Sequence, residues 1–434
     1  MTATLMTRGP QPDCLVVGSG IAGVCAALFI QRTGARVAIV DPNEPGTGAS
    51  FGNAGIVVNT KTRPVFAGLT ARSLFGMLRD PASPLNVRWS QFLGMTPWFM
   101  RMLRNANAAD VARITAALAA LSRAGEQAYA GLWAEAGMGD LVRARGNLAL
   151  NRTAEDRDQD WDGPLAPYRA AGVPMVKVDA AEIQDLAPAG PRYAAGVYSP
   201  DFQHTVSPVG FVARLFESFV ARGGTHFRAS VQGVEVRAGK VVGLRTAEGL
   251  LPGGSVVLAA GTGSADLATA MGEAVPHQAV GGYHVMLERP GITLETPLLP
   301  LDFRFAITPM RDGIRLAGTY EFGGAATRPT RARIEDMLRH IPSVLPGVDA
   351  TPGSTWRGFR SYLPDALPVI SPSRRAAGLF YLFGFSSSGM INGAAAGRTV
   401  AQLWQGTAPE IDPAPYRIDR FGPRIRPQAH EEAP

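Results

Sequence analysis

The sequence contains few cysteines and no long apolar segment, and both absences narrow the class of protein. Only two cysteines, Cys14 and Cys25, occur among the 434 residues. Two cysteines cannot form a disulfide framework, and no spacing typical of a metal site is present, so we expect no bound metal. No run of about 18 apolar residues occurs, so we expect no transmembrane segment. The N-terminal residues lack the apolar core of a secretory signal, which favours a cytoplasmic protein and leaves open a peripheral contact with the inner membrane.

The sequence also lacks clustered charge and internal repetition. Charged residues make up 18% of the chain, the net charge is +6, and the arginines are scattered. Because no basic stripe is present, we expect no nucleic-acid partner. No repeat with a period of about 20–50 residues is present, which excludes a solenoid. The 50 glycines and 34 prolines instead indicate a turn-rich α/β protein, long enough for two or three domains.

A glycine turn near the N-terminus predicts a dinucleotide site. Residues 14–41 read as a strand, a glycine turn, a helix and a second strand. Gly18 permits the tight turn, Gly20 lets a pyrophosphate approach the backbone, and Gly23 lets the helix pack closely. The whole turn is Gly18, Ser19, Gly20, Ile21, Ala22 and Gly23. Asp41 ends the second strand and is expected to bind ribose hydroxyls; the alternative is a glycine turn without a ligand.

A second loop of small residues favours FAD over NAD. Residues 48–55 read GASFGNAG, at a point where NAD-binding proteins normally continue into a helix. Such a loop allows close backbone approach to the pyrophosphate and flavin of an extended FAD. A plain NAD dehydrogenase is therefore disfavoured.

A third turn, residues 384–391, precedes the last predicted helix. Its sequence is GFSSSGMI, and the positive end of the helix would face an anion. A reduced flavin carries negative charge near N1 and O2 and would be stabilised there. An ordinary capped helix is the alternative.

These motifs, in this order, resemble the D-amino-acid oxidase superfamily of FAD enzymes. The segments VVLAAGTGS, TPMRDGIRLAGTYEF and RGFRSYLPDALPVISPS add to the likeness, which is greatest to the bacterial D-amino-acid-dehydrogenase branch. The likeness runs from about Asp13 to Phe421. It implies an α/β fold with a discontinuous Rossmann-like FAD-binding domain and an α+β substrate domain that has an antiparallel sheet and a helical insertion. The boundaries are 13–60, 200–275 and 352–421 for the FAD-binding domain, 61–199 and 276–351 for the substrate domain, and 1–12 and 422–434 for flexible termini.

The resemblance implies noncovalent FAD, since neither cysteine lies near the C-terminal turn. The glycine turn would hold the pyrophosphate and Asp41 the adenosine ribose. The implied contacts beyond these are Ser50, Asn53, Ala54 and Gly55 along the cofactor, Val231, Ala260 and Gly261 near the adenine, and Gly384, Ser387, Ser388, Gly389, Met390 and Ile391 at the flavin.

The resemblance also implies a carboxylate-binding arginine. Arg360 matches the position of that arginine in the family, and its forked guanidinium suits a carboxylate; the alternative is an arginine that lies at the surface or bonds to the backbone. Tyr283 is a second candidate, expected to face the pocket from an antiparallel strand, while its neighbour His284 is expected to face away and to be structural. Ser387 completes the set of candidate catalytic residues. His204, Arg304 and Tyr320 are further candidates for lining the pocket.

One departure from the branch concerns substrate recognition. The branch usually carries two histidines in its last turn, where this sequence has Phe385 and Ser387. If those histidines contact the substrate, the pocket of this protein is altered, and a standard D-amino acid is in doubt as its substrate.

The sequence therefore predicts an FAD-dependent oxidoreductase that oxidises the C–N bond of an amino acid or related carboxylated amine. Hydride transfer to flavin N5 would give an imine that hydrolyses. The electron acceptor, whether O2, a quinone or a protein, is left open. The alternatives are an accessory flavoprotein subunit of an oxidase complex and an FAD-dependent enzyme that modifies tRNA.

Overall fold

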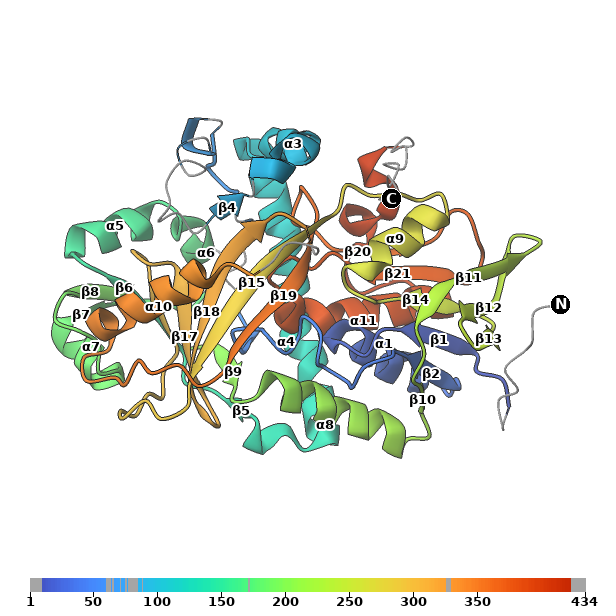
Figure 1. The fold of residues 1–434 in the computed structure, drawn as a ribbon, viewed down its shortest axis with the longest axis horizontal. Helices are drawn as coiled ribbons and strands as arrows, with labels where there is room; N and C mark the ends of the chain where they lie inside the picture. The colour runs from blue at the N-terminus through green and yellow to red at the C-terminus, as the bar shows by residue number, and fades with distance from the viewer. Residues whose placement is uncertain are drawn as a thin grey trace.

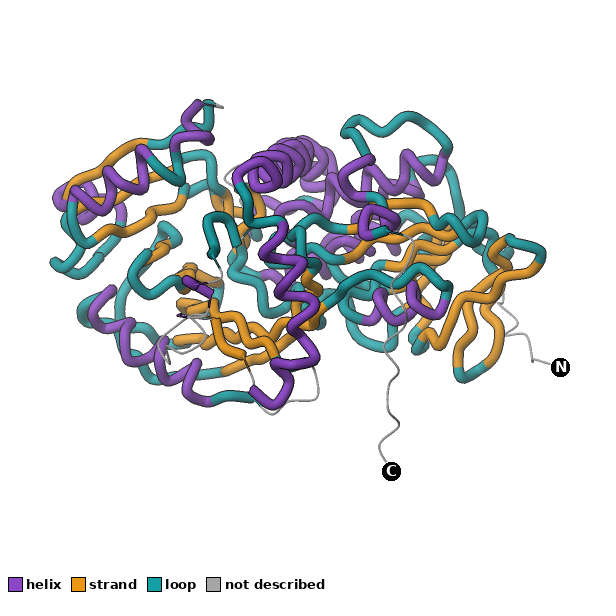
Figure 2. Tube along the Cα trace, turned by 90° about the horizontal axis from the view of Figure 1, so that it is seen from above, coloured by secondary structure: helices purple, strands orange, loops and turns teal. Residues whose placement is uncertain are grey.

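Two large β-sheets, one in each half of the molecule, organise the chain in this computed structural model (Figure 1). The structure describes residues 10–422, except 60–63, 65, 71, 75, 77–84, 88, 171 and 325–328. The predicted flexible termini, 1–12 and 422–434, lie almost entirely outside the described residues. Seen from above, the strands gather in separate groups with helices between them (Figure 2).

The first sheet is largely parallel and begins with the predicted strand–helix–strand unit. Five strands run parallel, and the sixth is antiparallel to its neighbour. Their order is β10 (Thr225–Phe227), β2 (Val37–Val40), β1 (Cys14–Val17), β14 (Val256–Leu258), β21 (Leu379–Phe383) and β20 (Val369–Pro372). The α/β fold predicted from the sequence is confirmed.

Alternate residues of these strands pack against different layers, which explains their continuous apolar sequences. Val16 and Val257 contact the helical layer, whereas Leu15 and Leu258 contact the opposite layer. The helical layer consists of α1 (Ile21–Gln31), α4 (Ala108–Ala136), α8 (Pro208–Ala221) and α11 (Gly389–Gln405). The opposite layer is a three-stranded antiparallel sheet of β11 (Val231–Arg237), β12 (Lys240–Thr246) and β13 (Gly249–Pro252), with α9 (Gly263–Ala270).

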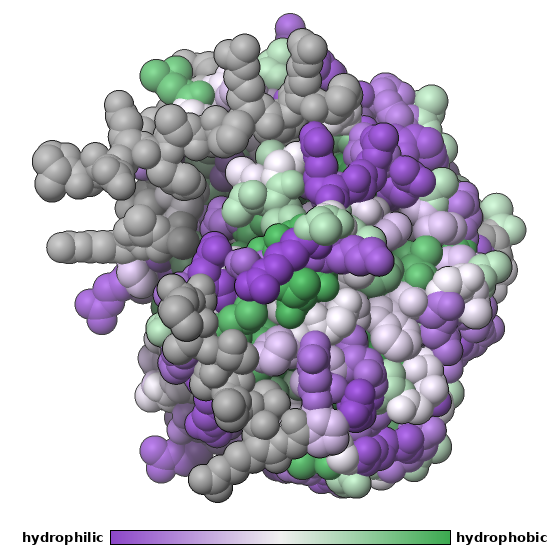
Figure 3. All heavy atoms as spheres, turned by 90° about the vertical axis from the view of Figure 1, so that its right-hand side faces the viewer, coloured by the Kyte–Doolittle hydropathy of each residue, from purple (hydrophilic) through white to green (hydrophobic). Residues whose placement is uncertain are grey.

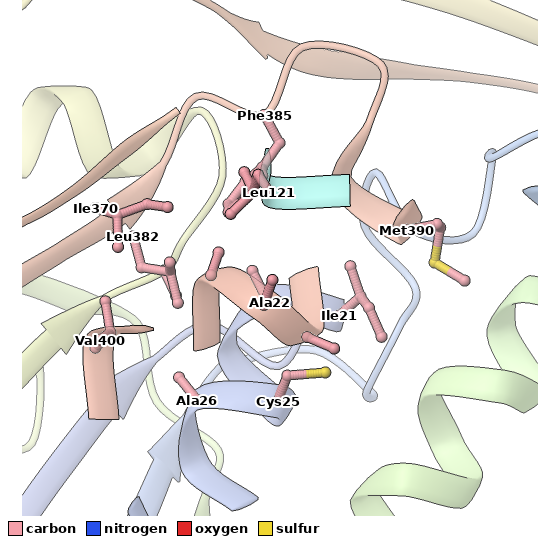
Figure 4. Close-up of a cluster of buried hydrophobic side chains, with 14 of the residues drawn as sticks. Ile21, Ala22, Cys25, Ala26, Leu121, Ile370, Leu382, Phe385, Met390 and Val400 are labelled. Carbon is pink, nitrogen blue, oxygen red and sulfur yellow. The ribbon is translucent and has the colours of Figure 1, made fainter. Parts of the chain in front are cut away.

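The packing of α1 against α11 forms the centre of the helical layer. Figure 4 shows Ile21, Ala22 and Cys25 of α1 in one apolar cluster with Met390 and Val400 of α11. Small residues allow this approach: a Cβ on Gly397 would lie 2.7 Å from the backbone nitrogen of Ala26. The two helices that follow the first and last glycine turns are thereby fixed side by side.

The second sheet, of nine strands, is mostly antiparallel. Its order is β19 (Thr355–Tyr362), β15 (Gln278–Leu287), β18 (Gly313–Phe322), β17 (Phe305–Met310), β16 (Leu298–Pro300), β6 (Asn147–Asn151), β8 (Ala195–Ser199) and β7 (Val176–Asp179), and β4 (Leu85–Val87) also pairs with β18. The antiparallel arrangement expected for residues 279–325 is present in β15, β17 and β18. Buried residues of α7 (Ala180–Leu186) and α10 (Arg331–Val344) pack against this sheet.

The remaining elements are short or connect the halves. They are α3 (Trp89–Arg104), α5 (Ala154–Asp162), α6 (Ala166–Ala170), the small sheet of β3 (Ile56–Val58), β9 (Gln203–Thr205) and β5 (Val142–Arg143), and the 3-10 turns η1 (Met138–Asp140), η2 (Ala414–Tyr416) and η3 (Ile418–Phe421). No helix of the described chain combines the length and apolarity needed to cross a bilayer. Figure 3 shows the outer face of the half that contains the parallel sheet, where hydrophilic side chains surround small apolar groups.

Two elements lie where the predicted domain boundaries did not put them. β19 belongs to the nine-stranded sheet, although residues 352–421 were assigned to the FAD-binding domain. α4 packs against α11, although residues 61–199 were assigned to the substrate domain. The predicted helical insertion is also interrupted, since β4 forms a strand with β18. The division into domains stays a prediction.

Candidate active site

A cavity of about 1140 Å³ lies between the two halves and is lined by both sheets. This volume exceeds that of a typical drug-sized pocket and suits a long cofactor together with a small substrate. We call the part lined by the first glycine turn, Asp41 and the loops after β10 and β14 the glycine end. We call the part lined by β17, β18, β19 and the turn before β17 the sheet end.

The first glycine turn forms the floor of the glycine end. Gly18 has φ +107°, and a Cβ there would lie 2.5 Å from the carbonyl oxygen of Ala259. A Cβ on Gly23 would lie 2.0 Å from the carbonyl oxygen of Gly18, so Gly23 serves packing and does not line the cavity. The main chain of residues 18–22 is thus brought directly against the cavity, as an anion site at a helix N-terminus requires.

Asp41 directly follows β2 beside this turn and lines the cavity. Its Oδ2 accepts hydrogen bonds from the Ser19 N–H at 2.8 Å and the Ser19 hydroxyl at 2.9 Å. Its Oδ1 accepts one from the Asn43 N–H at 2.9 Å. These bonds fix the carboxylate at the end of the strand, where it can bind a diol.

The loop of residues 48–55 continues the cavity wall from the glycine end. Ser50, Asn53 and Ala54 line the cavity, and the Ser50 hydroxyl accepts a hydrogen bond from the Ile21 N–H at 3.2 Å. Gly55 does not line it: its φ is +86°, and a Cβ would lie 2.9 Å from the Thr205 carbonyl oxygen. The loop is therefore tied to the start of α1.

Arg315 of β18, which sequence reasoning missed, holds this loop from the other half. Its guanidinium donates to the carbonyl oxygens of Phe51 at 2.9 Å and Asn53 at 2.8 Å, and the side chain is only 6% exposed. Burial lowers the pKa of Arg315 to about 10. The available signal was a lone arginine within an otherwise apolar strand, GIRLAG.

An aromatic group covers the same loop. His284 and Trp356 stack with ring centroids 5.4 Å apart, and Phe51 lies 5.6 Å from His284. Trp356 lines the cavity and packs directly over Gly52, where a Cβ would meet its ring at 1.7 Å. Burial, followed by the nearby Arg315 charge, lowers the pKa of His284 to about 3. The imidazole is therefore neutral.

The expected orientation of Tyr283 is wrong. Tyr283 and His284 do face opposite sides of β15, but Tyr283 points away from the cavity into the core beneath α10. Its hydroxyl donates to the Glu321 carboxylate and accepts from the Thr330 N–H at 2.8 Å. His284 instead lies on the face that carries Trp356. His204 is likewise buried and outside the cavity lining.

The third turn lies between the two ends. Of the residues predicted to contact the flavin, Gly384, Ser387, Gly389, Met390 and Ile391 line the cavity. Ser388 does not; it precedes α11, and its hydroxyl donates to the Phe385 carbonyl oxygen at 2.9 Å.

The two positions that depart from the resembling branch differ in exposure. Ser387 is exposed to the cavity, whereas Phe385 is only 9% exposed. Phe385 lies in the same apolar cluster as Leu121 of α4 (Figure 4). Its ring therefore supports the turn from behind as well as lining the cavity.

The remaining predicted cofactor residues, Val231, Ala260 and Gly261, all line the glycine end. Val231 begins β11, and the other two follow β14. Their convergence on the first glycine turn from distant parts of the chain agrees with the predicted adenine side of the cofactor.

Arg360 lines the sheet end, next to the third turn. Its guanidinium lies over Gly282, where a Cβ would approach Cζ to 2.5 Å, and Nη1 donates to the Thr319 carbonyl oxygen at 2.9 Å. The Tyr320 ring centroid lies 5.3 Å from Cζ. No ion pair with a described carboxylate is formed, so the charge is available to an anionic ligand.

Two buried hydroxyls beside Arg360 test whether the cavity suits a flavin. Ser361 and Ser386 line the cavity, and the Ser386 N–H donates to the Ser361 carbonyl oxygen at 2.9 Å. Their hydroxyl oxygens are buried without a partner among the described groups. A buried hydroxyl left unpaired costs about 1–3 kcal/mol, so a ligand with polar ring edges fits this position. Together with the glycine backbone at the other end, these residues suit FAD.

Comparison with known proteins agrees with this geometry. The family model described as FAD dependent oxidoreductase matches residues 13–403. A D-amino-acid oxidase of Bradyrhizobium diazoefficiens is 31% identical over 94% of this chain and 98% of its own length. A D-amino acid dehydrogenase of Granulibacter bethesdensis is 28% identical over 94% of this chain and 99% of its own. The solved structure of L-proline dehydrogenase from P. horikoshii shares the fold, with a TM-score of 0.73 at 17% identity over 95% of this chain and 98% of that one.

Proposed function

The chain belongs to the family of FAD dependent oxidoreductases, and we propose that it oxidises the C–N bond of an amino acid or related carboxylated amine. The single observation that carries the proposal is the position of Arg360. It lies at the sheet end of a cavity whose other end presents glycine backbone, and it has no described carboxylate partner.

The chain's own residues bind and orient the reactants. The main chain of residues 18–22 would hold the pyrophosphate, Asp41 the ribose hydroxyls, and residues 384–391 the flavin. When bound, FAD accepts a hydride from the carbon that bears the amine. Arg360 would bind the substrate carboxylate through two parallel hydrogen bonds and so fix that carbon toward the flavin. The resulting imine reacts with water to give a 2-oxo acid and ammonia or an amine.

Reactant positioning accounts for most of the chemistry that the chain has to supply. No described histidine lines the cavity, and besides the buried hydroxyls of Ser361 and Ser386, Ser387 and Tyr320 offer hydroxyl groups near Arg360 that could contact the amine. We therefore expect the substrate to react as its neutral amine, held by its carboxylate. Ser387 and Tyr320 would orient that amine.

An anaerobic titration of the purified holoprotein tests the proposal. D- and L-amino acids, N-methyl amino acids and cyclic imino acids are added, and the flavin absorbance is followed. Bleaching by one class would support the proposal and identify the substrate group, and readmitted air would then distinguish O2 from another acceptor. Bound flavin that no compound bleaches would instead favour an accessory subunit.

A further inference from the structure

The charged residues that line the cavity are separated by sign. The described acidic residues of the lining, Asp41, Glu44 and Asp266, lie at the glycine end, whereas Arg304 and Arg360 lie at the sheet end. One arginine is sufficient to bind the carboxylate of a simple amino acid. The second arginine at the same end requires a separate explanation.

Arg304 is held in an uncommon backbone conformation at the rim of the cavity. Its φ is +56°, and its N–H donates to the Pro300 carbonyl oxygen at 2.9 Å. A non-glycine residue in this region costs free energy and persists where the surrounding structure enforces it, often at ligand sites. Its side chain is exposed and lines the cavity.

The charge of Arg304 is not neutralised by its neighbours. Asp302, two residues earlier, pairs with Arg192 at 2.9 Å and accepts a hydrogen bond from Tyr193 at 3.1 Å. Arg304 forms no ion pair with a carboxylate in the part of the chain that the structure describes. Its guanidinium is thus available at the mouth of the cavity.

Both arginines approach the same short stretch of β18 from opposite sides. Arg360 reaches across β15 to the Thr319 carbonyl oxygen, while Phe305, directly after Arg304, pairs with Gly318. Gly318 allows this approach, because a Cβ there would lie 2.8 Å from the Phe305 Cβ. The two arginines therefore line the same end of one cavity.

Small side chains leave room for a substrate side chain at this end. Ala306 and Ala317 are paired across β17 and β18, and both line the cavity. With a carboxylate on Arg360, the substrate side chain has space beside these alanines and can extend toward Arg304.

We propose that the substrate is an amino acid whose side chain carries a second anionic group, bound by Arg304 while Arg360 binds the α-carboxylate. This inference rests on the proposed function and names the substrate class. The pyrophosphate of FAD is not the partner of Arg304, because the helix N-terminus that suits it lies in the other half.

Binding of non-reactive acids to the holoprotein provides a test that does not depend on turnover. Succinate and butyrate have the same number of carbons but differ by one carboxylate, and calorimetry gives their dissociation constants. We expect succinate to bind at least about tenfold more tightly, the size of one charge-assisted hydrogen bond. Among substrates, glutamate should react with a correspondingly lower KM than glutamine, in whichever enantiomer the enzyme accepts.

Two variants of Arg304 and one control variant test whether the charge of Arg304 causes the preference for succinate over butyrate. Arg304→Asn removes the charge, and asparagine tolerates a positive φ, so it should abolish the preference and change butyrate binding by less than about twofold. Arg304→Lys keeps the charge and should retain part of the preference. Arg311→Ala removes an exposed arginine that pairs with Asp140 at 3.1 Å outside the cavity, and should have no effect. The flavin spectrum of each variant confirms that it is folded and loaded.

The outcomes separate this inference from the function on which it rests. Equal binding of the two acids by the unmodified protein, or an equal loss of both in Arg304→Asn, would overturn the anionic subsite alone. If neither acid binds and no amino acid bleaches the flavin, the proposed function fails and the subsite fails with it.

Discussion

The glycine end of the cavity presents main-chain groups, whereas the sheet end presents side chains. At the glycine end, most main-chain contacts come from residues 18–22 and 48–54, which are close in sequence, and Val231, Ala260 and Gly261 join them from distant parts of the chain. At the sheet end, Arg304, Tyr320 and Arg360 come from separate strands or turns and meet only when the nine-stranded sheet forms. Backbone recognition suits a cofactor that is always the same, and side-chain recognition lets substrate preference change by single substitutions.

The largest effect should come from filling the space at Gly23. In Gly23→Ala the added Cβ would lie 2.0 Å from the Gly18 carbonyl oxygen, a backbone atom that cannot move without opening the turn. We expect about 1–3 kcal/mol of lost stability and purification without FAD, measured by denaturant unfolding and the flavin-to-protein absorbance ratio. Gly94→Ala, in open space on α3, is the control and should retain FAD.

Removing the Arg360 charge should affect the sheet end alone. Arg360→Leu deletes two charge-assisted hydrogen bonds to the substrate carboxylate, so kcat/KM should fall about 10²- to 10³-fold. FAD affinity should be unchanged, as measured by fluorescence titration of the apoprotein. Arg360→Lys should lie between, since an ammonium cannot form the paired contact. A loss of FAD affinity as large as the loss of kcat/KM would show that the two ends are not separable.

Arg315 tests the comparison between the two ends, because its side chain comes from the nine-stranded sheet but holds the loop that continues from the glycine end. Arg315→Met leaves the carbonyl oxygens of Phe51 and Asn53 without their buried donor, at about 1–3 kcal/mol for each unpaired group. FAD affinity should fall about tenfold or more, while the KM for the amino acid, measured at saturating FAD, stays within about twofold. Arg315→Lys, which keeps one donor group, should recover part of the affinity. The role assigned to Arg315 is wrong if KM changes and FAD affinity does not.

The smallest expected effect is the pH dependence of folding stability that His284 causes at the contact between the two halves. His284 has a pKa of about 3 in the folded protein, against about 6.5 when unfolded, so unfolding takes up a proton between these values. Stability should be complete above about pH 6.5 and decrease as the pH falls, by at most about 1.4 kcal/mol per pH unit for this residue. His284→Phe keeps an aromatic ring and should give a shallower slope in thermal unfolding between about pH 6.5 and pH 4. An unchanged slope would mean that His284 is protonated in the folded state.

The glycine end could be predicted because its signals are local. The spacing of Gly18, Gly20 and Gly23 after a strand, with Asp41 closing the next strand, fixes both the backbone path and the chemistry. Residues 384–391 were predicted for a similar reason, as a glycine turn before a helix. The predicted cofactor residues of the three turns line one cavity, apart from Gly23, Gly55 and Ser388, which pack behind it.

The sheet end was less predictable because it depends on which face of a sheet is covered. The alternation of side chains along a strand correctly predicts that Tyr283 and His284 lie on opposite faces. It does not predict which face is turned toward the cavity, because that depends on the packing of α10 over Tyr283. The membership of β19 in the nine-stranded sheet could not be read from the sequence, because its pairing with β15 joins residues far apart in the chain. Arg315 was missed because its partners are loop carbonyl oxygens, which have no sequence signature.

A crystal structure of the holoprotein with a bound carboxylate inhibitor would test this division of roles most directly. We predict the FAD pyrophosphate at the N–H groups of residues 18–22 and the inhibitor carboxylate paired with the guanidinium of Arg360. A pyrophosphate held elsewhere, or a carboxylate bound away from Arg360, would contradict the account.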